Sequence, residues 1–101
     1  MDIERIKELS TASRIRWPAH VAQRMMERSI SRSDVLSAIC SGEIIEDYPE
    51  DFPLPSCLIL GVVNKKPIHV VVAQDEEEIV IISVYRPDLN KFEPDFRTRR
   101  K

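Results

Sequence analysis

The chain has 101 residues, the length of one domain, so residues 1–101 are expected to fold as a single unit. Its apolar share of 43% and charged share of 32% are ordinary for a soluble globular protein. No apolar run approaches the ~20 residues of a membrane span, and the charged, periodic start excludes a secretory signal. Only two cysteines are present, Cys40 and Cys57, which predicts buried, reduced thiols in a cytoplasmic protein.

Charge is distributed unevenly, although the formal net charge is only −2. Residues 1–32 hold seven basic and four acidic side chains, residues 33–85 hold two and ten, and residues 86–101 hold six and three. If the two basic ends converge in space, they form a positive patch that suits a polyanion. The alternative is that these charges are solvated faces and a frayed tail.

The first part of the chain has the apolar period of helices. Three helices are predicted, over residues 2–13, 17–29 and 31–42. Residues suited to helix ends stand at these bounds: Asp2, Pro18, Ser31 and Gly42.

The second part has the pattern of strands. Four segments predict strands: an imperfect alternation over residues 43–48, an apolar run over residues 56–63, and near-continuous apolar runs over residues 68–74 and 78–85. Gly61, inside the second run, indicates a bulge or a close approach of another element. The order of three helices and then four strands predicts an α+β fold, with helices packed on a four-stranded antiparallel sheet. Residues 86–101 form a basic tail without a period, which Phe92 and Phe96 are expected to attach to the body.

The second predicted helix carries the first candidate functional residues. His20 and Arg24 lie four residues apart, so both lie on one face of the helix, at the border of its apolar arc. A helix packed on the sheet then holds them near the rim of the sheet. The simpler interpretation is an exposed histidine and an arginine paired with Glu27.

The last predicted hairpin carries the second group. Pairing of Gln74 with Glu78 would put His69 opposite Ser83, with Tyr85 as its diagonal neighbour on the same face. We expect this histidine also at the rim of the sheet. The simpler interpretation is a hydrogen-bonded structural histidine and a packing tyrosine with a solvated hydroxyl.

Motifs for metal or nucleotide binding are absent. The sequence contains no CxxC, no HxxxH, no P-loop and no GxSxG, so neither a metal nor a cofactor is predicted. The acidic run at residues 75–78 predicts a solvated turn, because adjacent acids in a turn point apart.

Several stretches taken together carry a family resemblance. They are "HVAQRMMERSIS", "DVLSAICSGEIIEDYPED", "LILG", "PIHVVVA" and "IVIISVYRPD", followed by a terminal phenylalanine and a basic cluster. From about His20 to Arg100 the chain resembles the bacterial family known as domain of unknown function 4258. It departs from the family pattern at Ser29, where a glycine is expected, and in "RWPA", where a threonine-rich lead-in is expected. Residues 1–14 are interpreted as an added N-terminal helix.

This resemblance implies an activity as well as a fold. The family is thought to belong with small RelE-like ribonuclease toxins, whose helices lie on a four-stranded antiparallel sheet. The resemblance then implies a toxin of a toxin–antitoxin pair that cleaves RNA without metal, through the RNA's own 2′-hydroxyl. Its partners would be RNA and a cognate antitoxin of the zinc-finger or helix-turn-helix type.

Such a reaction needs a base, an acid and cations for the phosphorane. A histidine can be base or acid near neutral pH, a tyrosine can donate a proton, and arginine grips phosphate in two places. The catalytic candidates are therefore His20, His69 and Tyr85, and the phosphate-binding candidates are Arg24, Arg86, Arg97, Arg99 and Arg100. Which histidine is the base stays open. The alternative is a non-catalytic module that binds protein or RNA with the same His/Arg patch.

Overall fold

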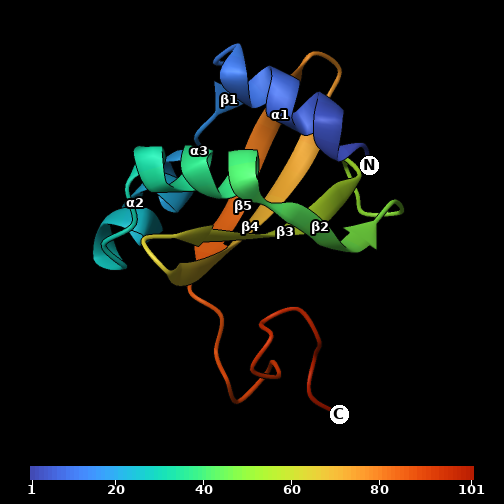
Figure 1. Cartoon of the computed structure of the whole chain (residues 1–101). Helices are drawn as coiled ribbons and strands as arrows, with labels where there is room; N and C mark the ends of the chain where they lie inside the picture. The colour runs from blue at the N-terminus through green and yellow to red at the C-terminus, as the bar shows by residue number, and fades with distance from the viewer.

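The computed structural model describes residues 1–101 as an α+β fold, with helices on one face of a five-stranded sheet (Figure 1). The elements in chain order are α1 (Ile3–Thr11), β1 (Ile15–Arg16), α2 (Ala19–Glu27), α3 (Arg32–Ser41), β2 (Glu43–Tyr48), β3 (Ser56–Val63), β4 (Lys66–Asp75) and β5 (Glu78–Tyr85). The strands lie in the order β1-β5-β4-β3-β2. The α+β class, the three helices and the order of the four long strands confirm the prediction. No helix is long and apolar enough to cross a membrane.

The prediction of a purely antiparallel, four-stranded sheet is wrong. β2 to β5 form an antiparallel meander, but β1 adds a fifth strand that pairs with β5 in parallel. This strand has two residues, which is too short for a periodic pattern to reveal. Long-range contacts hold it, because Arg16 forms ion pairs with Asp75 at 3.0 Å and with Glu78 at 2.7 Å. The predicted solvated turn is therefore partly an anchor for β1.

The core lies between the helices and the sheet, and α3 approaches β3 most closely. A Cβ atom at Gly61 would lie 2.2 Å from the carbonyl oxygen of Ala38, and one at Gly42 would lie 2.4 Å from the same oxygen. Only glycine fits at these two places, so the predicted close approach at Gly61 is confirmed. Cys57 is buried in this core, but Cys40 is exposed, so the prediction of two buried cysteines is half right.

The β4–β5 hairpin differs in register from the prediction. Its turn pairs Asp75 with Glu78, one residue further along than expected, and a bulge follows between Val71 and Val72. The bulge leaves one residue of β5 unpaired, so it shifts every later pair by one position. As a result His69 lies directly opposite Tyr85. The two residues share a face, as predicted, although as direct rather than diagonal neighbours.

The C-terminal segment crosses the face of the sheet that the helices leave free. Figure 1 shows it as an irregular red chain on the far side of the sheet from α1 and α3. Phe92 is buried and Phe96 is half-buried, so both attach the segment to the body as predicted. A single bridge, between Phe92 and Arg99, is its only β-type pairing. We call residues 88–101 the C-terminal strap.

Candidate functional site

His69 lies in the middle of the sheet face that the strap covers. Its side chain is completely buried, with 0% of the residue exposed. The Tyr85 hydroxyl lies 3.3 Å from Nδ1, and the Phe96 carbonyl oxygen lies 2.7 Å from Nε2. The ring of Phe92 packs edge-on at 4.7 Å between centroids. The expectation that His69 lies at the rim is therefore wrong, because the strap folds over this strand and no local pattern in residues 88–101 indicates that it does.

These contacts define the protonation state of the ring. A carbonyl oxygen can only accept, so Nε2 carries a proton and donates it to Phe96. Nδ1 of the neutral ring can then accept from the Tyr85 hydroxyl. Burial lowers the pKa of His69, and it outweighs the bond to the Phe96 carbonyl and the charge of Glu46, which raise it. Burial likewise raises the pKa of Tyr85, which keeps its hydroxyl protonated.

Three charged or polar side chains extend this site along the same face. Arg99 forms a two-pronged bond with Glu46, at 2.7 Å and 3.0 Å, and Tyr48 donates its hydroxyl to the same carboxylate. The hydrogen bond from Arg99 lowers the pKa of Glu46, and burial raises the pKa of Tyr48. We call the five residues the sheet-face cluster: His69, Tyr85, Glu46, Tyr48 and Arg99.

Glu46 and Tyr48 are functional candidates that the sequence did not point to. Both lie on β2, in the stretch "EIIEDY", where a bulge between Ile44 and Glu46 breaks the alternation of faces. Alternating polar residues in a strand usually indicate a solvated face. Only the pairing with β3 and the return of the strap bring them close to His69, so no local signal was available.

His20 lies in a different place, on the rim of the sheet as expected. It lines a hollow of about 300 Å³ between α2 and the end of β5. We call it the α2 hollow; its lining residues are His20, Val21, Arg24, Arg28, Ile82, Ser83 and Val84. Arg28 donates to the Val84 carbonyl oxygen at 2.6 Å, so its guanidinium is fixed at the edge of β5. Arg24 is 64% exposed, and its only carboxylate neighbour, Glu27, is 3.9 Å away.

The structure does not bring the two histidines together. α2 packs on the helical face of the sheet, whereas His69 faces the strap on the opposite side. Tyr85 accompanies His69, and Arg24 accompanies His20. Strand β5 links the two groups, since Ser83 lines the hollow and Tyr85 lies two residues further on the same strand. A single compact site built from both histidines is therefore not present.

The remaining predicted phosphate-binding arginines are distributed around the strap. Arg97 pairs with Glu43 at 3.1 Å, and Arg100 pairs with Glu93 at 3.2 Å. Arg86 donates to the Ser29 carbonyl oxygen at 3.4 Å and lines a separate hollow of about 230 Å³. The basic tail is thus not frayed, because Arg97, Arg99 and Arg100 are bound to acids of β2 and of the strap itself.

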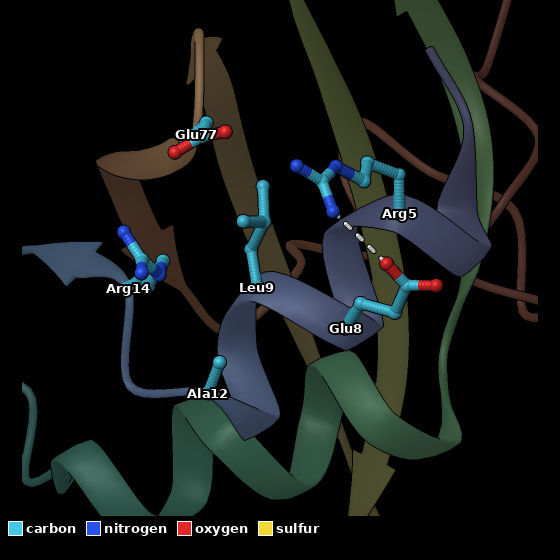
Figure 2. A pocket seen from close by; sticks show the side chains of 6 residues that line it. All are labelled: Arg5, Glu8, Leu9, Ala12, Arg14 and Glu77. Atoms are coloured by element: carbon cyan, nitrogen blue, oxygen red, sulfur yellow. Dashed lines mark hydrogen bonds and ion pairs between the residues drawn. The ribbon is translucent and has the colours of Figure 1, made fainter.

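Another hollow lies at the opposite end of the molecule, where α1 meets the β4–β5 turn (Figure 2). Its volume is about 310 Å³, and Arg5, Arg14, Glu8 and Glu77 line it. Arg5 is already paired with Glu8 at 3.0 Å, as the dashed line in Figure 2 shows. With two acids for two bases it has no excess charge, and neither histidine lines it. It is the weakest candidate for a site.

The family comparison covers most of the sheet and two of the helices. Residues 17–86 match the family described as "Domain of unknown function (DUF4258)", which confirms the resemblance over this range; the predicted extension to Arg100 lies outside the match. The match includes both histidines and Glu46, and it leaves out α1, β1 and the strap. No group of three or more His, Cys, Asp or Glu side chains is arranged to hold a metal ion. No curated protein and no solved structure shows a significant match. Because the matched residues make up more than half of the chain, the protein belongs to this family.

Proposed function

We propose that the protein is a metal-independent ribonuclease, the toxin of a toxin–antitoxin pair, which cleaves RNA through its 2′-hydroxyl. One observation carries this proposal: His69 and Tyr85 contact each other at 3.3 Å in a cluster that also holds Arg99. A proton acceptor and a proton donor on the sheet, with a guanidinium on the strap that covers them, are the groups that this reaction requires. The RelE-like relationship rests on the resemblance of the sequence.

Each group has a role in this proposal. With the strap displaced and the Tyr85 hydroxyl turned towards the leaving 5′-oxygen, Nδ1 of the neutral His69 takes the proton of the 2′-hydroxyl, which then attacks the adjacent phosphorus. Tyr85, whose raised pKa keeps it protonated, gives its proton to the leaving 5′-oxygen. Arg99 neutralises the charge that develops on the phosphorane. Atoms balance, since the new bond to phosphorus replaces the bond to the 5′-oxygen and the product is a 2′,3′-cyclic phosphate.

The α2 hollow has a separate role in the same proposal. His20, Arg24 and Arg28 hold the RNA backbone where it bends around the free end of β5. Two residues along a strand span about 7 Å, so an RNA strand seated at Ser83 can reach Tyr85. Arg86, Arg97 and Arg100 supply further contacts at the rim, and His20 remains a second candidate for the general acid.

The second candidate function is a non-catalytic module that binds RNA or protein. Complete burial of His69, with both ring nitrogens engaged, favours it. In that case the histidine holds the strap in place and the exposed arginines do the binding. The two candidates differ in one respect, namely whether the wild-type protein turns over RNA.

The deciding experiment is cleavage of a defined RNA oligonucleotide by the purified protein. We expect products with 2′,3′-cyclic phosphate, and the same rate with and without EDTA. Tyr85→Phe and His69→Gln should each lower the rate by roughly 10²–10⁴, the usual contribution of a general acid or base. Ser56→Ala is the matched control, since it removes a hydroxyl from the same sheet face, where it bonds Asp51 and not His69. Its rate should stay within a few-fold of the wild type.

Other outcomes separate the alternatives. No cleavage by the wild type, combined with RNA binding, would establish the module. Cleavage only after addition of a divalent metal would exclude the mechanism. Induced expression in a bacterium tests the toxin role: growth should stop, and Tyr85→Phe should restore it. Coexpression of the neighbouring small gene should also restore growth if that gene encodes the antitoxin.

A further inference from the structure

The strap closes the only approach to His69 from its side of the sheet. Phe92 covers the ring, and the Phe96 carbonyl oxygen accepts a hydrogen bond from Nε2 at 2.7 Å. The result is a histidine with 0% exposure on a sheet face that has no helix on it. Any ligand of His69 must therefore displace the strap.

The strap is held to the sheet by two ion pairs, by the buried ring of Phe92 and by the hydrogen bond from His69. Its own backbone contains five hydrogen bonds, which join Lys91 and Phe92 with Asp88, Glu93 with Thr98, Phe96 with Glu93, and Arg100 with Lys91. Across to the sheet, Arg99 bonds Glu46 in two places and Arg97 pairs with Glu43 at 3.1 Å. Phe92 is its one buried side chain.

The two carboxylates differ in how firmly they hold the strap. Glu46 is 20% exposed and accepts both bonds at 3.0 Å or less, the geometry in which an arginine–carboxylate pair is strongest. Glu43 is 54% exposed, so solvent weakens its pair with Arg97. Glu46 is the main anchor and Glu43 the weaker one.

We propose that residues 88–101 are a latch over His69, held shut by Glu46 and Glu43, and that a phosphate polyanion opens it by taking Arg99 and Arg97 from these carboxylates. Phosphate suits the guanidinium fork as well as carboxylate does, and a polyanion offers many phosphates in one chain. When the arginines leave, the strap loses both ion pairs to β2 and can move off His69. That RNA is the polyanion rests on the proposed function; the latch itself does not.

The chain contains its own reporter for the closed state. Diethyl pyrocarbonate modifies accessible histidine rings, and the protein has only His20, which is exposed, and His69, which is buried. In the wild type His20 should react at the rate of a free histidine, while His69 is protected. Mass spectrometry of the two peptides measures both rates in one sample.

Removing the two carboxylates should open the latch. In the double variant Glu43→Gln/Glu46→Gln we expect His69 to react roughly tenfold faster. Each partly exposed ion pair multiplies the equilibrium constant for closure of the strap by a factor of a few, and the variant lacks both pairs. His20 should not change. Arg97→Gln/Arg99→Gln removes the same pairs from the strap side, so the result does not depend on one variant folding. Thermal melting verifies that each variant is folded.

Glu93→Gln is the matched control. It breaks the Arg100–Glu93 pair, which lies inside the strap and does not join it to the sheet. His69 should stay protected in this variant. An unchanged His69 rate in both double variants would overturn the latch, and so would an equal increase in Glu93→Gln.

The polyanion is tested without any cleavage. A 2′-O-methyl RNA oligonucleotide lacks the attacking hydroxyl, so it can bind but cannot react. Adding it should speed solvent exchange of the His69 Nε2 proton, measured by NMR, because the Phe96 carbonyl oxygen accepts that proton only while the strap is closed. Unchanged or slower exchange with RNA bound would overturn opening by RNA. Faster exchange in a protein that never cleaves ordinary RNA would sustain the latch and exclude the ribonuclease.

Discussion

The C-terminal strap and the α2 hollow both carry clustered arginines, but these charges are in different states. In the strap, three arginines each contact a carboxylate at 2.7–3.2 Å: Arg97, Arg99 and Arg100. Beside α2, Arg24 has one carboxylate at 3.9 Å, and Arg28 donates to a backbone carbonyl. A paired arginine must give up its carboxylate before it binds a phosphate, whereas an unpaired one is available at once. A count of basic residues therefore measures how much charge a region holds, and the fold decides how much of it a ligand can use.

The two histidines show the same contrast. His69 is enclosed by the strap and holds two partners, while His20 stands exposed beside two cations. The first can act only after a movement, and the second can act at once. The structural and functional roles of the two histidines can thus be separated by experiment. Removing the buried ring lowers the free energy of unfolding, and removing the exposed ring does not.

The largest effect should come from removing each ring in turn. His69→Ala leaves a cavity beneath Phe92 and strips the Tyr85 hydroxyl and Phe96 carbonyl oxygen of their partner. We expect a loss of about 2–4 kcal/mol in the free energy of unfolding, the range for a large buried side chain with hydrogen bonds. His20→Ala, at an exposed position, should cost less than about 0.5 kcal/mol. Urea denaturation measures both, and equal losses would contradict the contrast.

Much of the fold follows from the sequence because local patterns carry it. The helix caps are an example: Asp2 accepts from Glu4, and Ser31 and Asp34 form a capping box, as residues three apart at a helix start allow. Strand β1 has no such local pattern. Its two residues are in place because α1 and the acidic hairpin turn leave room for Arg16, and this is a tertiary effect.

The candidate site is harder to predict, because pairs distant in the sequence build it. That His69 and Tyr85 share a face follows from the hairpin pattern, but their direct pairing depends on the bulge after Val71. Glu46 and Arg99 are 53 residues apart in the chain, and neither is distinguished by its neighbours. The strap has no period, so no sequence argument places it on the sheet. Burial of His69 is a consequence of that placement.

A smaller effect is expected from single arginines on RNA affinity. Arg24→Gln should reduce the slope of log affinity against log salt by about 0.7, one single-strand phosphate contact. Arg100→Gln should reduce it by less, because Arg100 is already bound to Glu93 and to the Leu89 carbonyl oxygen. Fluorescence anisotropy with a 2′-O-methyl RNA oligonucleotide measures both slopes. Equal slopes for the two variants would mean that the ion pair of Arg100 does not reduce its contact with RNA phosphate.

The smallest effect is a dependence of stability on pH that belongs to His69 alone. Burial holds the pKa of His69 in the folded protein below its ordinary value of 6.5. The unfolded chain therefore binds more protons between these two values, and stability rises with pH through that interval. The contribution is complete above about pH 6.5 and is lost as the pH falls below it towards the folded pKa.

His69→Gln should lack this step, so the stability difference between it and the wild type should narrow in acid. His20→Gln, altered at an exposed position, should keep the step. Urea denaturation between pH 4.5 and 8, with on the order of one measurement every half unit, resolves this step in the free energy of unfolding. An identical pH profile for His69→Gln and the wild type would mean that the folded protein does not hold His69 as a buried, neutral ring.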